Sequence, residues 1–138
     1  MTQPWQWSAT TTLAHTRSKK VSCREIAVAT LERIAAVNPS VNALTCVLGD
    51  EALLAADRAD AAHQRGEPGG PMLGVTVTTK INTDQVGTPT DDGLSRFASR
   101  MPTEDSPAVA RLRAAGALLV GRSNSPAMGL AQNTGNDL

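Results

Sequence analysis

The chain has 138 residues and a hydrophobic content of 41%, which suffices for the core of one ordinary domain. Its 13 basic and 13 acidic side chains cancel without forming a basic tract, so nucleic acid and anionic membranes are not expected partners. No stretch approaches the roughly 18 apolar residues of a membrane span, and the start of the chain does not resemble a secretion signal, so we expect a cytoplasmic protein.

The amino-terminal part is predicted to be helical after an initial arm. Residues 1–20 have no clear hydrophobic period, which indicates an irregular arm or a short helix. Residues 22–37 are predicted to form a helix, because Ser22 and Glu25 make an S-x-x-E capping box and apolar side chains then share one helical face. We expect Asn38-Pro39 to end this helix.

A second helix and a strand are predicted next. Residues 50–65 place a stripe of alanines on one helical face, and Gly66 closes the helix. After a turn rich in glycine and proline, residues 73–80 contain many β-branched side chains, which is typical of a strand. Strand alternation places Lys80 on the same side as three small residues, which are Gly74, Thr76 and Thr78.

A long loop, a helix and another strand complete the predicted elements. Residues 81–101 contain turn residues and no period, and a loop of this length inside a compact domain is usually functional. Ser106-Pro107 then begins a helix that Gly116 ends, and residues 117–121 make a short apolar strand. The order strand, loop, helix, strand predicts an α/β protein in which helices cover a sheet.

Common catalytic and metal-binding motifs are absent from the sequence. It contains no GxSxG elbow, HExxH pair, phosphate-binding loop or dinucleotide fingerprint, and Cys23 and Cys46 form no CxxC pair. We therefore expect no metal, no cofactor and two buried free thiols. His15 and His63 are each isolated, as solvated histidines usually are. The adjacent carboxylates at residues 91–92 lie among glycines and are expected to serve a turn.

Lys80 remains as the candidate, because a lysine at the end of an apolar strand is unusual. Two interpretations stay open on the residues alone. A strand-end lysine is commonly a solvated surface charge. A lysine on a central strand covered by helices can instead be kept neutral by burial and can then act as a general base.

Four blocks in order resemble the amidase-signature family and together cover nearly the whole chain. They are Asn38-Pro39-Ser40-Val41-Asn42-Ala43, similar to "NPxVNA"; Gly70-Pro71-Met72-Leu73-Gly74-Val75, similar to "GPLxGVP"; residues 105–117, similar to "DSPVVxRLRxAGA"; and residues 120–126, similar to "xGxTNxP". Each block is weak alone, whereas four in the right order are specific. Two positions depart from the family pattern: Thr76 stands where proline is more frequent, and Ile81 where aspartate is more frequent.

The resemblance implies the amidase-signature fold, a mixed β-sheet covered by α-helices, with residues 1–138 as the amino-terminal part of one domain. It also implies an amidase that hydrolyses a carboxamide C–N bond through a Ser-cisSer-Lys triad. Lys80 would be the triad lysine, which takes a proton from the middle serine. Both serines and the loop that holds the oxyanion would lie beyond Leu138, so we expect the chain alone to be inactive. Met128 and Gly129, in the turn after the "TNxP" block, are the expected substrate contacts.

The expected partner is a small-molecule amide, and a homodimer of the complete protein is one possible assembly. Two other interpretations remain. The chain could belong to the amidase-type subunit of a glutamine-dependent amidotransferase, which shares the fold and the triad. It could also be a non-catalytic truncated relative that acts as a binding module. The arm with Trp5 and Trp7, together with Ile81, favours a free-standing amidase.

Overall fold

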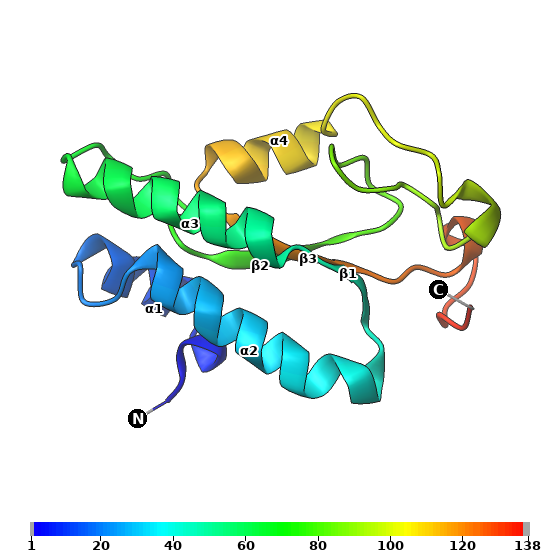
Figure 1. Ribbon diagram of the computed structural model, residues 1–138, viewed down its shortest axis with the longest axis horizontal. Coiled ribbons are helices and arrows are strands. Elements are labelled where there is room, and N and C mark those ends of the chain that lie inside the picture. Colours follow the sequence, from blue (N-terminus) through cyan, green and yellow to red (C-terminus); the bar gives the residue numbers. More distant parts are fainter. Residues whose placement is uncertain (1, 137–138) are drawn as a thin grey trace.

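The computed structural model describes residues 2–136 and shows helices packed on a small mixed sheet (Figure 1). In chain order its elements are the 3-10 helix η1 (Pro4–Gln6), α1 (Ala9–Arg17), α2 (Cys23–Val41), β1 (Leu44–Val47), α3 (Gly49–Gln64), β2 (Thr76–Lys80), the 3-10 helix η2 (Ser95–Phe97), α4 (Pro107–Ala114), β3 (Leu118–Ser123) and the 3-10 helix η3 (Ala127–Gly129). The strand order is β1-β3-β2, with β3 antiparallel to β1 and parallel to β2. The predicted α/β class is confirmed.

The first long helix, α2, begins as predicted but continues past its expected end. The capping box is present, with the Ser22 hydroxyl accepting from the Glu25 N–H and the Glu25 carboxylate accepting from the Ser22 N–H. The prediction that Asn38-Pro39 ends the helix is wrong, since helical geometry runs to Val41. Proline removes only one N–H donor here, and the last turn is closed by Asn42, whose N–H donates to the Asn38 carbonyl at 2.7 Å. Asn42 then adopts the left-handed conformation that ends the helix.

The amino-terminal arm, of which Met1 lies outside the described residues, forms a short helix, which is the second of its two predicted alternatives. Helix α1 is capped by Ser8 and occupies nine of its residues. Thr16 is buried in it and donates a hydrogen bond of 3.0 Å to the Leu73 carbonyl. The arm is thereby attached to the segment that leads into β2.

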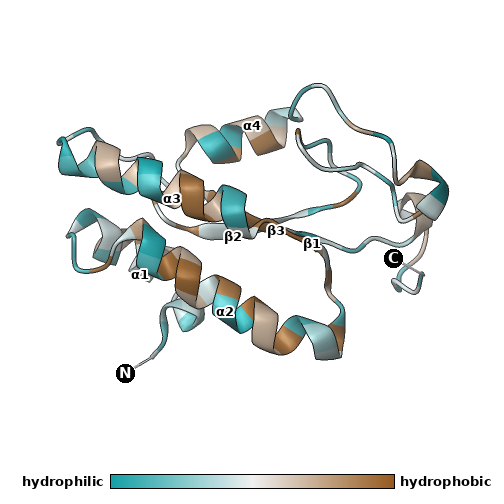
Figure 2. Cartoon of the chain, in the orientation of Figure 1, coloured by the Kyte–Doolittle hydropathy of each residue, from teal (hydrophilic) through white to brown (hydrophobic). Residues whose placement is uncertain are grey.

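The core lies on both faces of the central strand β3. Leu118 belongs to one apolar cluster, together with Cys23 of α2 and Ala56 of α3. The adjacent Leu119 belongs to a second cluster, together with Val109 of α4. Because consecutive strand residues face opposite sides, α2 and α3 cover one face of β3 and α4 covers the other. Figure 2 shows hydrophobic colour along β3 and on alternate turns of α2 and α3.

The strand that ends at Lys80, β2, and its parallel neighbour β3 both differ from their predicted bounds. β2 begins at Thr76 rather than at residue 73, because Gly74 has a φ of +76° and its N–H donates to the Gly116 carbonyl. β3 extends beyond the predicted residue 121 to Ser123 and runs parallel to β2 as far as Lys80. The long segment between β2 and α4 contains only the short helix η2, as the absence of a period predicts.

β1 and β2 are the outer strands of the described sheet. Within residues 2–136 each pairs only with β3, so one edge of each strand carries unpaired backbone groups. Apolar side chains lie exposed near β1, among them Val41 at 60% and Val47 at 46%. Open strand edges beside apolar surface favour pairing with further β-structure.

The 138-residue chain expressed alone is therefore predicted to self-associate and to unfold over a broad temperature range. Size-exclusion chromatography with light scattering and thermal denaturation by circular dichroism would measure both properties. Val47→Lys places a charge at the open edge of β1 and should shift the population toward monomer. Leu54→Lys on α3, where Leu54 is 52% exposed, is the matched control and should have less effect. A wild-type monomer with one sharp, cooperative transition contradicts this prediction.

Candidate active site

Lys80 lies at the carboxyl end of β2, opposite Ser123 at the carboxyl end of β3. Because parallel strands end at the same edge of a sheet, the loops that follow β2 and β3 come together there, which is where α/β proteins commonly bind ligands. Lys80 is exposed to solvent in the part of the chain that the structure describes. The next residue, Ile81, is only 2% exposed, so the position where the family more often has aspartate packs inward in this chain.

The peptide bond between Lys80 and Ile81 is anchored to β3 through both of its polar groups. The Ile81 N–H donates to the Ser123 carbonyl at 3.0 Å. The Lys80 carbonyl accepts from Nη2 of Arg122 at 2.9 Å and from the Thr83 N–H at 3.0 Å. The backbone that carries the lysine is therefore held in one orientation.

Arg122 is the centre of this arrangement and was not singled out from the sequence. It is 1% exposed, and its guanidinium also donates to the Thr83 carbonyl at 2.7 Å and to the Thr88 hydroxyl. Burial lowers the pKa of Arg122, although the nearby Cys46 and Asp91 oppose that shift. The sequence shows only that Arg122 directly follows the apolar run at 117–121, which does not reveal its bonding partners.

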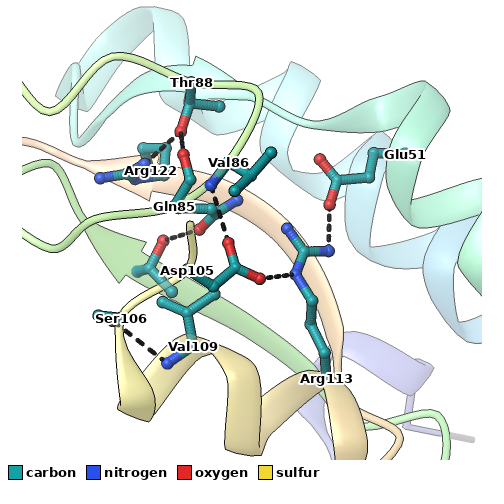
Figure 3. Close-up of polar contacts among 10 residues, drawn as sticks. Glu51, Gln85, Val86, Thr88, Asp105, Ser106, Val109, Arg113 and Arg122 are labelled. Carbon is teal, nitrogen blue, oxygen red and sulfur yellow. Dashed lines mark hydrogen bonds and ion pairs between the residues drawn. The ribbon is translucent and has the colours of Figure 1, made fainter. Parts of the chain in front are cut away.

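The first turns of the loop after β2 are filled with buried polar side chains. Thr79 is 6% exposed and donates a hydrogen bond of 2.7 Å to the side-chain oxygen of Gln85, which is fully buried. The Thr88 hydroxyl, which accepts from Arg122, donates to the Gln85 carbonyl at 3.1 Å. Figure 3 shows Arg122, Thr88 and Gln85 meeting beneath the loop. These bonds explain how a segment without a hydrophobic period is ordered.

A second anchor joins the same loop to α3 and α4. The Asp105 carboxylate accepts from the Val86 N–H and from Nε of Arg113, both at 2.8 Å. Arg113 also forms an ion pair with Glu51 at the start of α3 (Figure 3). Burial acts to lower the pKa of Arg113, but the bonds to Glu51 and Asp105 outweigh it and raise that pKa. The loop is thus held from two sides, by β3 and by the helices.

The two predicted substrate contacts lie beside the loop that follows Lys80. The Met128 N–H donates to the Asp92 carbonyl at 2.8 Å, and its side chain is 53% exposed, so it does not fill the described core. A Cβ at Gly129 would lie 3.9 Å from Nδ2 of Asn82, two residues after Lys80. The structure therefore brings this turn and the lysine segment to one end of the sheet. Their role in substrate binding stays a prediction.

The remaining candidates have structural roles or lie on other elements. The Asp91 carboxylate accepts from the Gly93 N–H at 2.8 Å, as expected for a turn. The His15 ring contacts the Trp7 ring in the arm in a tilted arrangement, with ring centroids 4.6 Å apart. His63 is half-buried in the last turn of α3, so neither histidine is fully solvated. Cys46 is half-buried. Cys23 is buried, and burial together with Asp60 raises the pKa of its thiol to about 12.

Metal binding and membrane insertion have no candidates in the described part of the chain. Among residues 2–136, no three histidine, cysteine, aspartate or glutamate side chains gather as ligands for a metal ion. None of the helices there combines the length and apolar character needed to span a membrane.

The fold and this site define an α/β protein with a lysine at the carboxyl edge of its sheet, and comparison with known proteins identifies its family. The Amidase family model matches residues 25–138, so the chain belongs to the Amidase family. It is 39% identical over 134 residues to an indoleacetamide hydrolase of Bradyrhizobium diazoefficiens, covering 97% of this chain and 26% of that protein. It is 39% identical over 113 residues to a subunit of the glutamyl-tRNA(Gln) amidotransferase of Salinispora arenicola, covering 82% of this chain and 23% of that protein.

A solved structure agrees with this assignment. The crystal structure of a bacterial aryl acylamidase of the amidase-signature family superimposes with a TM-score of 0.83 and 26% identity, over 88% of this chain and 26% of that one. The amidase-signature fold is therefore confirmed. The chain spans about a quarter of the length of the relatives it matches.

Gly93→Ala is predicted to destabilise the protein more than Gly87→Ala. Both glycines have a positive φ, so each alanine costs on the order of 1–2 kcal/mol in backbone strain. Only at Gly93 would the new Cβ meet backbone, 2.4 Å from the Ser125 carbonyl oxygen, whereas nothing lies within 4 Å at Gly87. We expect Gly93→Ala to lower the free energy of unfolding by about 2–4 kcal/mol in denaturant titrations. Equal losses in the free energy of unfolding for the two variants would contradict the close approach of Gly93 to the backbone of Ser125.

Proposed function

We propose that this chain is the amino-terminal part of an amidase that hydrolyses a carboxamide C–N bond through a Ser-cisSer-Lys triad, with Lys80 as the base. The observation that carries the proposal is the position of Lys80. It ends a strand within the residues that the family matches, and the peptide bond that follows it is anchored through both polar groups. A base must be held in a fixed place if it is to transfer protons efficiently.

In the proposed reaction the neutral amine of Lys80 accepts a proton from the middle serine. That serine takes the proton of the nucleophilic serine, whose oxygen attacks the amide carbonyl carbon. The C–N bond then breaks, the leaving nitrogen takes a proton back through the relay, and an acyl-enzyme ester forms. Water then loses a proton to the same relay and attacks the ester carbonyl carbon; the bond between that carbon and the serine oxygen breaks, the serine oxygen takes the proton back from the relay, and the carboxylic acid is released. On this proposal both serines lie beyond Leu138, and this chain supplies the proton acceptor.

The proposed role requires the Lys80 side chain to be buried, and residues 2–136 do not bury it. Lys80 is exposed and β2 is an outer strand of the described sheet, whereas a lysine can act as a base only in its neutral form, which contact with water disfavours. The matching relatives are about four times as long as this chain, as the 26% coverage of the indoleacetamide hydrolase indicates. We infer that further chain pairs along the free edge of β2, buries Lys80 and brings the serines to it.

The proposed substrate is a small amide with an apolar acyl or aryl group. Relatives include an indoleacetamide hydrolase and an aryl acylamidase. The exposed apolar side chain of Met128, beside the loop that follows Lys80, suits contact with such a group. A panel of indole-3-acetamide, phenylacetamide and acetanilide, assayed with the complete protein for release of ammonia or aniline, tests this proposal. If the complete protein hydrolyses none of these three amides, the proposed substrate class is wrong.

The amidase-type subunit of a glutamine-dependent amidotransferase is a second candidate, favoured by the 39% identity to the amidotransferase protein of Salinispora arenicola. That match covers 82% of this chain, whereas the match to the indoleacetamide hydrolase covers 97%. Activity on glutamine distinguishes the two candidate functions. A free-standing amidase should prefer the panel amides, whereas an amidotransferase component should release ammonia from glutamine and need partner subunits.

Lys80→Met is predicted to remove most of the amidase activity of the complete protein while leaving its fold intact. Methionine has a similar length but cannot accept a proton, so turnover should fall by a factor of about 100 or more. Lys80→Arg should fail as well, because a guanidinium stays charged and cannot act as the base. Steady-state kinetics measure the loss, and circular dichroism confirms folding. A surface lysine would tolerate both changes, so near wild-type turnover by either variant refutes the assignment of Lys80.

The 138-residue chain by itself is predicted to hydrolyse no amide. A base without a nucleophile and without donors for the oxyanion cannot form an acyl-enzyme. The measurement is product release from the same amide panel by purified chain, with the complete protein as the positive control. Turnover by the chain, after removal of any longer form, would show that its catalytic groups lie within residues 1–138.

A further inference from the structure

We propose that Arg122 is a positioning residue of the amidase site, which sets the direction in which Lys80 points. The proposal rests on the proposed role of Lys80 as the base. Arg122 lies on β3, next to Ser123, the residue that pairs with Lys80 across the sheet. Its guanidinium reaches across to the loop after β2 and is buried there with 1% of the residue exposed.

A single nitrogen of Arg122 holds both ends of the turn that begins at Lys80. Nη2 donates to the Lys80 carbonyl at 2.9 Å and to the Thr83 carbonyl at 2.7 Å, while the Thr83 N–H closes the turn on the Lys80 carbonyl at 3.0 Å. The other side of the same peptide bond is held by the Ser123 carbonyl, which accepts from the Ile81 N–H. A displacement of this turn, which would carry the Cα of Lys80 and its side chain with it, has to break the arginine bonds.

The second terminal nitrogen extends the same control to the next turn of the loop. Nη1 of Arg122 donates to the Thr88 hydroxyl, and that hydroxyl donates to the Gln85 carbonyl at 3.1 Å. One guanidinium thus joins three loop positions, Lys80, Thr83 and Thr88. A lysine at position 122 would present one compact charge and could not reproduce the planar fork.

The cost of this arrangement argues that it serves the site rather than the core alone. The hydrogen-bond acceptors of Arg122 are two backbone carbonyls and one hydroxyl, all uncharged, so the guanidinium is buried without a bonded carboxylate. An apolar residue would fill the same space without that desolvation cost. An apolar residue could not, however, donate a hydrogen bond to the Lys80 carbonyl.

A positioning role predicts a loss that depends on the leaving group. An amide expels a poor leaving group that needs a proton delivered through the relay, whereas a 4-nitrophenyl ester expels a stable anion that needs none. A misdirected Lys80 should therefore slow amide cleavage far more than ester cleavage. A residue that only stabilises the fold changes the amount of active protein and lowers both rates in the same proportion.

The experiment compares kcat and KM of the complete protein for the best amide of the panel and for the 4-nitrophenyl ester of the same acid. For Arg122→Met we expect kcat on the amide to fall about 100-fold, with KM changed less than threefold, and the ratio of amide to ester turnover to fall about tenfold. Arg122→Lys should give an intermediate ratio. Arg24→Met, which removes an exposed arginine paired with Asp57, is the control and should keep the wild-type ratio.

A gentler pair of variants decides the matter if Arg122→Met does not fold. Thr88→Val keeps the shape of the side chain and removes the acceptor of Arg122, whereas Thr88→Ser keeps the hydroxyl. A ratio that falls severalfold for Thr88→Val and is restored in Thr88→Ser supports the proposal. Amide and ester rates that fall in equal proportion in these variants overturn it. If Lys80→Met is inactive in that case, the proposed function stands and only the positioning role fails; full activity of Lys80→Met removes the proposed function itself.

Discussion

β3 has to be buried on both of its faces, and most of the architecture follows from that requirement. Leu118, Leu119 and Val120 are each at most 2% exposed, and consecutive residues of a strand face opposite sides. A sheet covered on one face only would leave half of these side chains in water. Helices therefore flank β3 on two sides, with α2 and α3 packed over Leu118 and α4 over Leu119. The small side chains of Ala27 and Ala56 let α2 and α3 approach closely.

The same strand ends in a buried charge, and this explains the order of the loop beside it. After three apolar residues and Gly121, β3 buries Arg122 one residue before the strand ends. Buried polar groups need partners, and the backbone carbonyls of the loop after β2 supply them. Asp105 satisfies an N–H of the same loop from the opposite side. In this part of the molecule, hydrogen bonds to buried polar groups hold the loop in place of apolar contacts.

The sequence predicted the elements with strong local signals and missed contacts that depend on distant segments. The capping box at Ser22 and the cap at Ser106 both appear in the structure, because each is built from residues three apart. The end of α2 was misplaced, since Asn38 bonds both backbone groups of Leu44 through its side chain and steadies the turn that follows Pro39. That pair of bonds joins residues only six apart, but residue types alone do not show it.

The site was predicted in the same uneven way. The resemblance to the amidase-signature family nominated Lys80 and the turn at Met128, and the structure brings both segments to one end of the sheet. The contribution of Arg122 could not be seen from the sequence, because its partners lie 34 to 42 residues away and include two backbone carbonyls, which leave no trace in residue types.

On the proposal that Lys80 is the base, its place on an outer strand links catalysis to completion of the sheet. Lys80 and Thr78 are exposed, and the edge of β2 beside them has no strand partner within residues 2–136. Any segment that pairs with that edge must lie against the lysine, since neighbouring strands are only about 5 Å apart. Water then leaves the amine and the backbone edge in one step. Within residues 2–136 the bonds from Arg122 and Ser123 hold the backbone of Lys80 without any strand on the other edge of β2.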